Sequence, residues 1–286
     1  MKYIPSLLTI LALTVGSASA ATGELKAQAN KILEANQDSV VWLSVIVQQE
    51  VGVEGNANAS VKINGIQPGK DQKLEICGTL VDPSGLIVTS LGSIGGGSLM
   101  DGREVETPNG MMRLKSKMIF KEVKVIMPDG SEIPADVVMK DTDLDLAFFK
   151  VRGDSAEAKG VTFKAIDLNN NTKAGIFDDV IVIGRMDAAM DRTPNGYITE
   201  VLGMVKKPRE FLSVQTPRPG TPVFAADGKL VGISVIRKPS TANMQPTPVV
   251  LTAKDVQKIA VQAKNAQPEK VGNAESKKEE PKKEAS

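Results

Sequence analysis

The chain of 286 residues contains no histidine, and this absence excludes more chemistry than any other feature of its composition. A Ser-His-Asp triad needs an imidazole to take the proton of the serine hydroxyl, so this chain cannot assemble one. Zinc sites that are built on imidazole ligands are excluded for the same reason. We therefore expect neither a metal nor any other cofactor.

Cysteine, aromatic residues and net charge are scarce as well. The single cysteine, Cys77, cannot form an internal disulfide, so the fold has to be stabilised by burial of apolar side chains. Aromatic residues make up 3% of the chain, which argues against a surface for stacking carbohydrate or single-stranded nucleic acid. A formal net charge of +1 gives no field that would attract nucleic acid or an anionic membrane. We expect no nucleic-acid partner.

No apolar run approaches the roughly 20 residues that a membrane-spanning helix requires. The run from Ile4 to Val15 follows a lone basic residue, Lys2, and precedes the small residues Ala18-Ser19-Ala20. This order is typical of a secretory signal peptide that is cut after Ala20. The sequence therefore predicts an exported protein, periplasmic or extracellular, without a membrane span.

Most of the remaining chain is predicted to form short β-strands. Three turn sequences, Asp82-Pro83-Ser84-Gly85, Pro128-Asp129-Gly130 and Ala226-Asp227-Gly228, separate apolar runs and predict hairpins. The strands expected from β-branched and apolar runs are 39–47, 76–81, 86–89, 123–127, 133–139 and 146–151 in the first half, and 180–184, 196–202, 211–215, 222–225 and 230–236 in the second.

Two helices and two irregular segments complete the prediction. A short amphipathic helix is expected near the N-terminus, over 21–36, and a second helix over 252–263 with Thr252 as its N-cap. The segments 95–98 and 108–118 have no strand-like pattern and are expected to form a long inter-strand loop. The predicted organisation is a signal peptide at 1–20, the N-terminal helix at 21–36, a first β-barrel at 37–152, a linker at 153–160, a second β-barrel with its C-terminal helix at 161–263, and a disordered charged tail at 264–286.

Three segments resemble the HtrA/Deg-type serine proteases. Residues 77–94, CGTLVDPSGLIVTSLGSI, resemble the segment that leads to the catalytic histidine of that family, and the histidine position falls on Gly92. Residues 123–151 resemble the segment that carries the catalytic aspartate, which is retained as Asp145. The sequence PVFAADGKLVGISV resembles the segment after the catalytic serine, and counting back from it places Pro219 at the serine position.

The resemblance implies an all-β, trypsin-like double β-barrel with a short N-terminal helix and a C-terminal helix. It also implies a protein that has lost its catalytic machinery, because Gly92 and Pro219 replace the base and the nucleophile. A proline has no N–H to offer to a developing oxyanion. No serine or cysteine occurs between Ser213 and Ser234, so shifting the alignment by several residues restores no nucleophile.

Several residues allow a chemical and a structural interpretation. Asp145 is a working acid or, without a histidine to orient, a remnant held by local hydrogen bonds whose replacement has a modest effect. Thr221 is a conceivable nucleophile, with Lys229 or Lys238 as its base, although their spacing gives no support. Cys77 is a reactive thiol or a buried small side chain. The methionines at 100, 111, 112, 118, 186, 190 and 204 are soft-metal ligands or fillers of apolar gaps.

These observations lead to three functional hypotheses. The first is a non-catalytic module of the cell envelope that binds a protein or peptide partner through a degenerate substrate cleft or an exposed strand edge. The alternative is a trypsin-like serine endopeptidase with an unrecognised site. The third is a structural envelope component that engages its surroundings through the charged tail.

Overall fold

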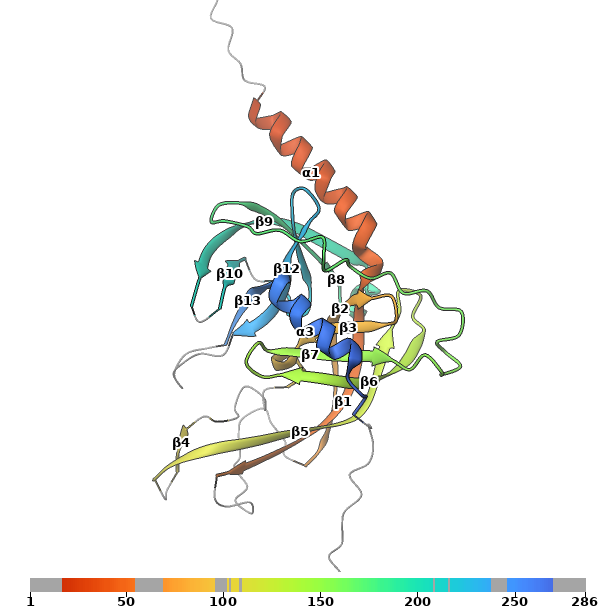
Figure 1. Ribbon diagram of the computed structural model, residues 1–286, viewed down its shortest axis with the longest axis vertical. Helices are drawn as coiled ribbons and strands as arrows, with labels where there is room; N and C mark the ends of the chain where they lie inside the picture. The colour runs from red at the N-terminus through yellow and green to blue at the C-terminus, as the bar shows by residue number, and fades with distance from the viewer. Residues whose placement is uncertain are drawn as a thin grey trace, which may run out of the picture.

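The computed structural model describes residues 17–54, 69–95, 102, 104–107, 110–207, 209–215, 217–237 and 246–269 (Figure 1). Most of the predicted signal peptide, Met100, Lys238 and most of the predicted charged tail lie outside the described residues.

The first half of the chain forms a closed antiparallel barrel. Its strands follow one another around the barrel as β1, β2, β3, β7, β6 and β5, and pairing of β1 with β5 closes it. A short strand, β4, extends the sheet by pairing with the start of β5. The bounds are β1 Val40–Val53, β2 Asp71–Asp82, β3 Leu86–Ser90, β4 Glu104–Thr107, β5 Gly110–Ile126, β6 Glu132–Asp141 and β7 Leu146–Val151.

The second half forms another closed antiparallel barrel, with the strand order β10, β13, β12, β11, β8 and β9. The connection from β7 to β8 lies against the first barrel, where the N–H of Ile166 donates to the carbonyl of Leu80. The bounds are β8 Asp179–Arg185, β9 Pro194–Val205, β10 Phe211–Val214, β11 Pro222–Ala225, β12 Leu230–Arg237 and β13 Thr247–Thr252. The expected all-β double barrel is thereby confirmed.

Period-two alternation explains why the barrel strands are apolar almost throughout. In β1, Val41, Leu43 and Val45 point into the first barrel, whereas Val40 and Trp42 belong to a separate core between the barrels. A strand that is buried on both faces needs apolar residues at odd and even positions alike. The strand sequence therefore encodes two packing surfaces at once.

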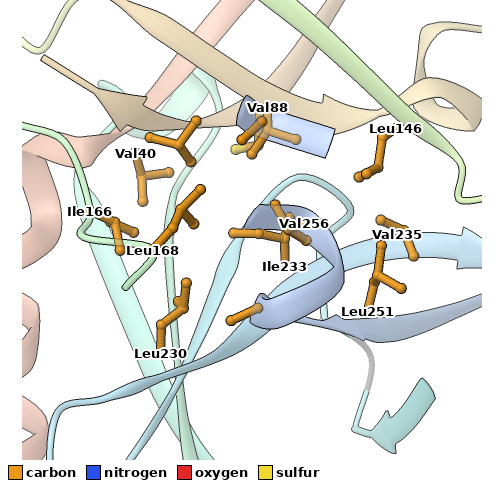
Figure 2. Close-up of a cluster of buried hydrophobic side chains, with 14 of the residues drawn as sticks. Val40, Val88, Leu146, Ile166, Leu168, Leu230, Ile233, Val235, Leu251 and Val256 are labelled. Atoms are coloured by element: carbon orange, nitrogen blue, oxygen red, sulfur yellow. The ribbon is translucent and has the colours of Figure 1, made fainter. Parts of the chain in front are cut away.

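The core between the barrels holds the two halves together (Figure 2). Both barrels, the connecting segment and the C-terminal helix all contribute side chains to this core. We call the interface between the two barrels, which this core fills, the seam. The residues labelled in this view are Val40, Val88 and Leu146 from the first barrel, Ile166 and Leu168 from the connection, Leu230, Ile233, Val235 and Leu251 from the second barrel, and Val256 from the helix.

In the described part of the chain, two α-helices accompany the barrels. The first, α1 (Ser17–Asn36), packs its C-terminal half on the second barrel and extends beyond it at its N-terminal end (Figure 1). The second, α3 (Ala253–Asn265), is capped by Thr252, whose hydroxyl accepts from the N–H of Asp255, as the sequence predicted. No helix in the described part of the chain is long and apolar enough to cross a membrane. The described residues also form the 3₁₀ helices η1 Gln37–Ser39, η2 Leu91–Ile94 and η3 Ala188–Met190.

The three predicted hairpin turns are confirmed, and each ends in a glycine with φ between 81 and 84°.

The prediction of an irregular loop over 108–118 is wrong, because β5 begins at Gly110 and pairs with the end of β1 through Val53 and Leu114. Here Arg113 and Lys115 are exposed while Leu114 is buried, so the alternation of a half-buried strand was present. The long side chains and three methionines between 110 and 118 concealed it.

Candidate functional site

Asp145 occupies a buried position at the entrance to β7. Only 4% of its surface is exposed, and its backbone lies in the left-handed region with φ of 59°. Its carbonyl accepts a hydrogen bond from the N–H of Leu91 at 2.8 Å, which connects it to η2. The predicted aspartate and histidine positions, Asp145 and Gly92, are therefore neighbours in space, as the resemblance implies.

The carboxylate of Asp145 is held by donors from both barrels. Its Oδ1 accepts from the N–H of Gly92 at 2.7 Å, within the first barrel. Its Oδ2 accepts from the N–H of Ile236 on β12 of the second barrel at 2.7 Å, and also from the hydroxyl of Ser90. In a working triad an imidazole N–H would be the donor to this carboxylate. Here a backbone group of β12 donates instead, which joins the two barrels directly.

The predicted serine position, Pro219, lies in a tight turn. The N–H of Thr221 donates to the carbonyl of Arg218 at 3.2 Å, and Gly220 has φ of 87°. Proline at the first central position and a glycine of positive φ at the second are the marks of a type II β-turn. The residues at the predicted serine position therefore form a type II β-turn.

This turn packs tightly on the first barrel. The carbonyl of Gly220 accepts from the hydroxyl of Thr79 at 2.7 Å, and the N–H of Gly220 donates to the carbonyl of Ser234 at 2.7 Å. A Cβ at position 220 would lie against the carbonyl oxygen of Cys77 and 2.7 Å from the hydroxyl of Thr89. Only glycine fits at this point of the seam.

The turn offers few groups to an oxyanion. On the alignment of the sequence, the two donor positions of the family fall on Pro217 and Pro219, and neither residue has an N–H. The N–H groups of Gly220 and Thr221 both donate within the protein, to Ser234 and Arg218. Four of the five positions from 217 to 221 therefore have no free backbone donor.

Among the described residues, the other candidate groups do not converge on a second site. The hydroxyl of Thr221 donates to the carbonyl of Arg218 at 2.6 Å. The ammonium of Lys229 pairs with Asp227 at 2.7 Å in the β11–β12 hairpin, beyond the far end of β11 from Thr221. Lys238, the other candidate base, lies outside the described residues.

The methionines at 111, 118, 190 and 204 do not gather in one place. Met118 packs against the interior of the first barrel and Met204 against that of the second, which agrees with gap filling. Met111 and Met190 are exposed on different barrels. Nor does the described part of the chain bring together three or more Cys, Asp or Glu side chains that could hold a metal ion.

Cys77 is 2% exposed, and burial raises the pKa of its thiol to about 11, with Arg218 and Arg185 opposing that rise. We expect iodoacetamide to leave Cys77 unmodified in the folded protein near neutral pH and to alkylate it after unfolding, because the thiolate is the reactive form. Mass spectrometry of both samples measures this. Alkylation of the folded protein at the rate of free glutathione would contradict it.

Arginines that the sequence analysis did not single out support the seam around Cys77. Arg185 is 4% exposed and donates to the backbone carbonyls of Gln37 and Val40, at 2.9 and 2.5 Å. The guanidinium of Arg218 lies 5.1 Å from the centre of the Trp42 ring. These partners are more than 140 residues apart in the sequence, and no local pattern marks such long-range contacts.

Comparison with known protein families agrees with this architecture. Residues 77–233, more than half of the chain, match the family described as "Trypsin-like peptidase domain". Among solved structures, the chain is similar to the apo form of the MamO protease domain from Magnetospirillum magneticum, with 17% identity, a TM-score of 0.44, and coverage of 79% of this chain and 97% of that one. A search of curated protein sequences gave no match. The match over 77–233 includes Gly92, Asp145 and Pro219, and the chain belongs to the family of trypsin-like peptidase domains.

Proposed function

We propose that this trypsin-like domain is an exported, non-catalytic protein of the cell envelope that binds a protein or peptide partner. The observation that supports this most directly is the hydrogen bond from the N–H of Ile236 to the carboxylate of Asp145. In a protease, the carboxylate of this aspartate would orient the general base; here it accepts the N–H of Ile236. Export is proposed from the signal-like N-terminal sequence.

The chemistry of acyl transfer would have to be supplied without any of its usual parts. The chain has no histidine to act as the base, and a proline stands at the nucleophile position. Each missing oxyanion donor removes about 3 to 4 kcal/mol of transition-state stabilisation in related enzymes. Loss of base, nucleophile and both donors favours a binding role over a slow catalytic one.

The second candidate function, serine-type endopeptidase activity at an unrecognised site, is favoured by membership of a peptidase family. Thr221 is the nearest hydroxyl to the former nucleophile position in the sequence. Its hydrogen bond to Arg218 keeps that hydroxyl within the turn, and no basic side chain among the described residues forms a hydrogen bond with it. We rank this candidate below the binding role for that reason.

We expect the purified mature protein to leave unfolded casein intact and to remain unlabelled by a serine-directed phosphonate. Release of labelled peptides and mass spectrometry of the intact protein are the two measurements, with a Thr221→Ala variant as the control for a threonine nucleophile. Turnover that survives stringent purification and disappears in Thr221→Ala would establish the endopeptidase instead.

A rescue experiment examines the same proposal from the other side. The double substitution Gly92→His and Pro219→Ser is expected to give no measurable hydrolysis, because it restores only one of the two oxyanion donors and leaves Pro217 to constrain the turn. Grafting Gly-Asn-Ser-Gly-Gly over 217–221 together with Gly92→His is the fairer reconstruction. Activity from the two-residue variant alone would show that the turn is less altered than we propose.

A further inference from the structure

Phe177 is an exposed aromatic residue in a strained backbone conformation. It has φ of 72° and 80% of its surface exposed. Its N–H donates to the carbonyl of Val201 on β9 at 2.9 Å, while the N–H of Val201 donates to the carbonyl of the next residue, Asp178, at 3.0 Å. Two residues opposite one form a β-bulge, and the left-handed position of such a bulge is normally glycine.

A phenylalanine at this position gains no burial and destabilises its backbone. A left-handed conformation costs a residue other than glycine about 1 to 2 kcal/mol. Strain of this kind concentrates at functional sites, so an exposed Phe that incurs it points to a role outside the fold. Five of the six other phenylalanines, at 120, 148, 149, 211 and 224, are buried, and Phe163 is partly buried.

Two more apolar side chains lie next to Phe177. Ile176 precedes it and is 48% exposed, and Leu202 follows Val201 on β9 and is 60% exposed. We call Ile176, Phe177 and Leu202 the Phe177 patch. Contiguous exposed apolar side chains of this kind are typical of interaction surfaces.

Three exposed carboxylates adjoin the Phe177 patch along the chain. Asp178, Asp179 and Glu200 are exposed, and Asp179 is directly opposite Glu200 in the β8–β9 register. Like charges directly opposite in a sheet are destabilising. No ion pair to these three carboxylates is found among the described residues, and the carboxylate of Asp178 accepts the N–H of Gly175 at 2.7 Å. A cationic partner would relieve the repulsion between them.

The former cleft is a poorer docking surface. Along the β12 edge, both backbone groups of Ser234 are bonded to Gly220 and Thr221, and the N–H of Ile236 is bonded to Asp145. A peptide could not add a strand there without breaking these bonds. This disfavours binding through the degenerate substrate cleft, which was one of the two modes that the sequence suggested.

We propose that the Phe177 patch binds a basic amphipathic segment of another protein, with its apolar side chains on Phe177 and Leu202 and its Lys or Arg side chains on Asp179 and Glu200. The inference rests on the proposed binding function and names its surface and the chemistry of its partner. Charge complementarity selects this occupant over an acidic segment or an anionic membrane.

The test uses a fluorescein-labelled peptide of leucine and lysine at amphipathic helical spacing, and a leucine–glutamate peptide as its counterpart. We expect saturable binding of the basic peptide only, measured by fluorescence anisotropy. The double variant Phe177→Gly/Leu202→Thr should weaken it by at least about tenfold. Asp179→Asn/Glu200→Gln should weaken it and reduce its dependence on salt. Met111→Thr removes an equally exposed apolar side chain from the other barrel and should change nothing.

Phe177→Gly keeps the experiment interpretable, because glycine suits the bulge and the variant should melt at or above the wild-type temperature. Binding that the patch variants leave unchanged, or equal binding of the acidic peptide, would overturn the proposal. So would a wild-type dimer that becomes monomeric in the double variant, since the occupant would then be a second copy. None of these measurements depends on hydrolysis. A negative binding result would therefore overturn the role of the Phe177 patch without contradicting the proposal that the domain is non-catalytic.

Discussion

Replacing Asp145 with asparagine is expected to lower the free energy of unfolding by about 3 kcal/mol. Whichever way the amide is oriented, its NH₂ group faces a backbone donor, either the N–H of Gly92 or that of Ile236. That donor then loses a charge-assisted hydrogen bond and stays buried. Asparagine tolerates the left-handed backbone at this position, so the substitution changes the hydrogen bonding and the charge with little added strain.

The measurement is thermal and chemical denaturation of Asp145→Asn beside Asp143→Asn, an exposed aspartate two residues earlier in the same turn. A loss of about 3 kcal/mol corresponds to a fall in Tm of about 6 to 12 °C in a domain of this size. The control removes the same charge and should shift the Tm by less than about 2 °C. Equal melting of the two variants would mean that the inter-barrel bond contributes nothing.

The sequence predicted a modest effect at this position, because it showed only the local part of the environment. The first-barrel donors Ser90 and Gly92 belong to the segment that resembles the family, so hydrogen bonds from there were foreseeable. Ile236 lies 91 residues from Asp145, and its N–H is a backbone group that leaves no trace in residue identity. The link between the barrels therefore appears only once the fold is known.

Predictability along the rest of the chain follows the same distinction. Hairpin turns such as Asp82-Pro83-Ser84-Gly85 were correctly identified because glycine and proline act through their own backbone. The turn at Pro219 and Gly220 could be inferred to be stiff, although its closeness to Cys77 could not. The start of β5 was missed because long charged side chains obscured its alternation. Phe177 could not be found, since its left-handed conformation runs against the preference of its residue type.

At the predicted catalytic positions, hydrogen bonds join the two barrels. Hydrogen bonds that a protease would direct to a catalytic base and a substrate join the barrels instead, through Asp145 and through the Gly220 turn. In the non-catalytic role that we propose, this region is free to contribute to stability, since polar groups that are held open for chemistry leave hydrogen bonds unmade.

Substituting Gly220 with alanine is expected to lower the free energy of unfolding by about 3 to 4 kcal/mol. About 1 to 2 kcal/mol comes from φ of 87°, which alanine adopts poorly. The rest comes from crowding, because the new Cβ meets the carbonyl of Cys77 and the hydroxyl of Thr89 across the seam. Neither neighbour is the end of a flexible side chain, so relief requires the barrels to shift apart.

Gly228→Ala is the matched control for this substitution. Gly228 has φ of 82°, but its added Cβ would meet only a side-chain carbon of Ile32, at an ordinary contact distance of 3.8 Å. It should lose about 1 to 2 kcal/mol, and any gain from a stiffer unfolded chain is common to both variants. Urea denaturation with unchanged slopes gives both values. If the two variants lose the same stability, the Gly220 turn does not pack tightly against the first barrel. The tight packing that argues against restoring an active site at this position would then be absent.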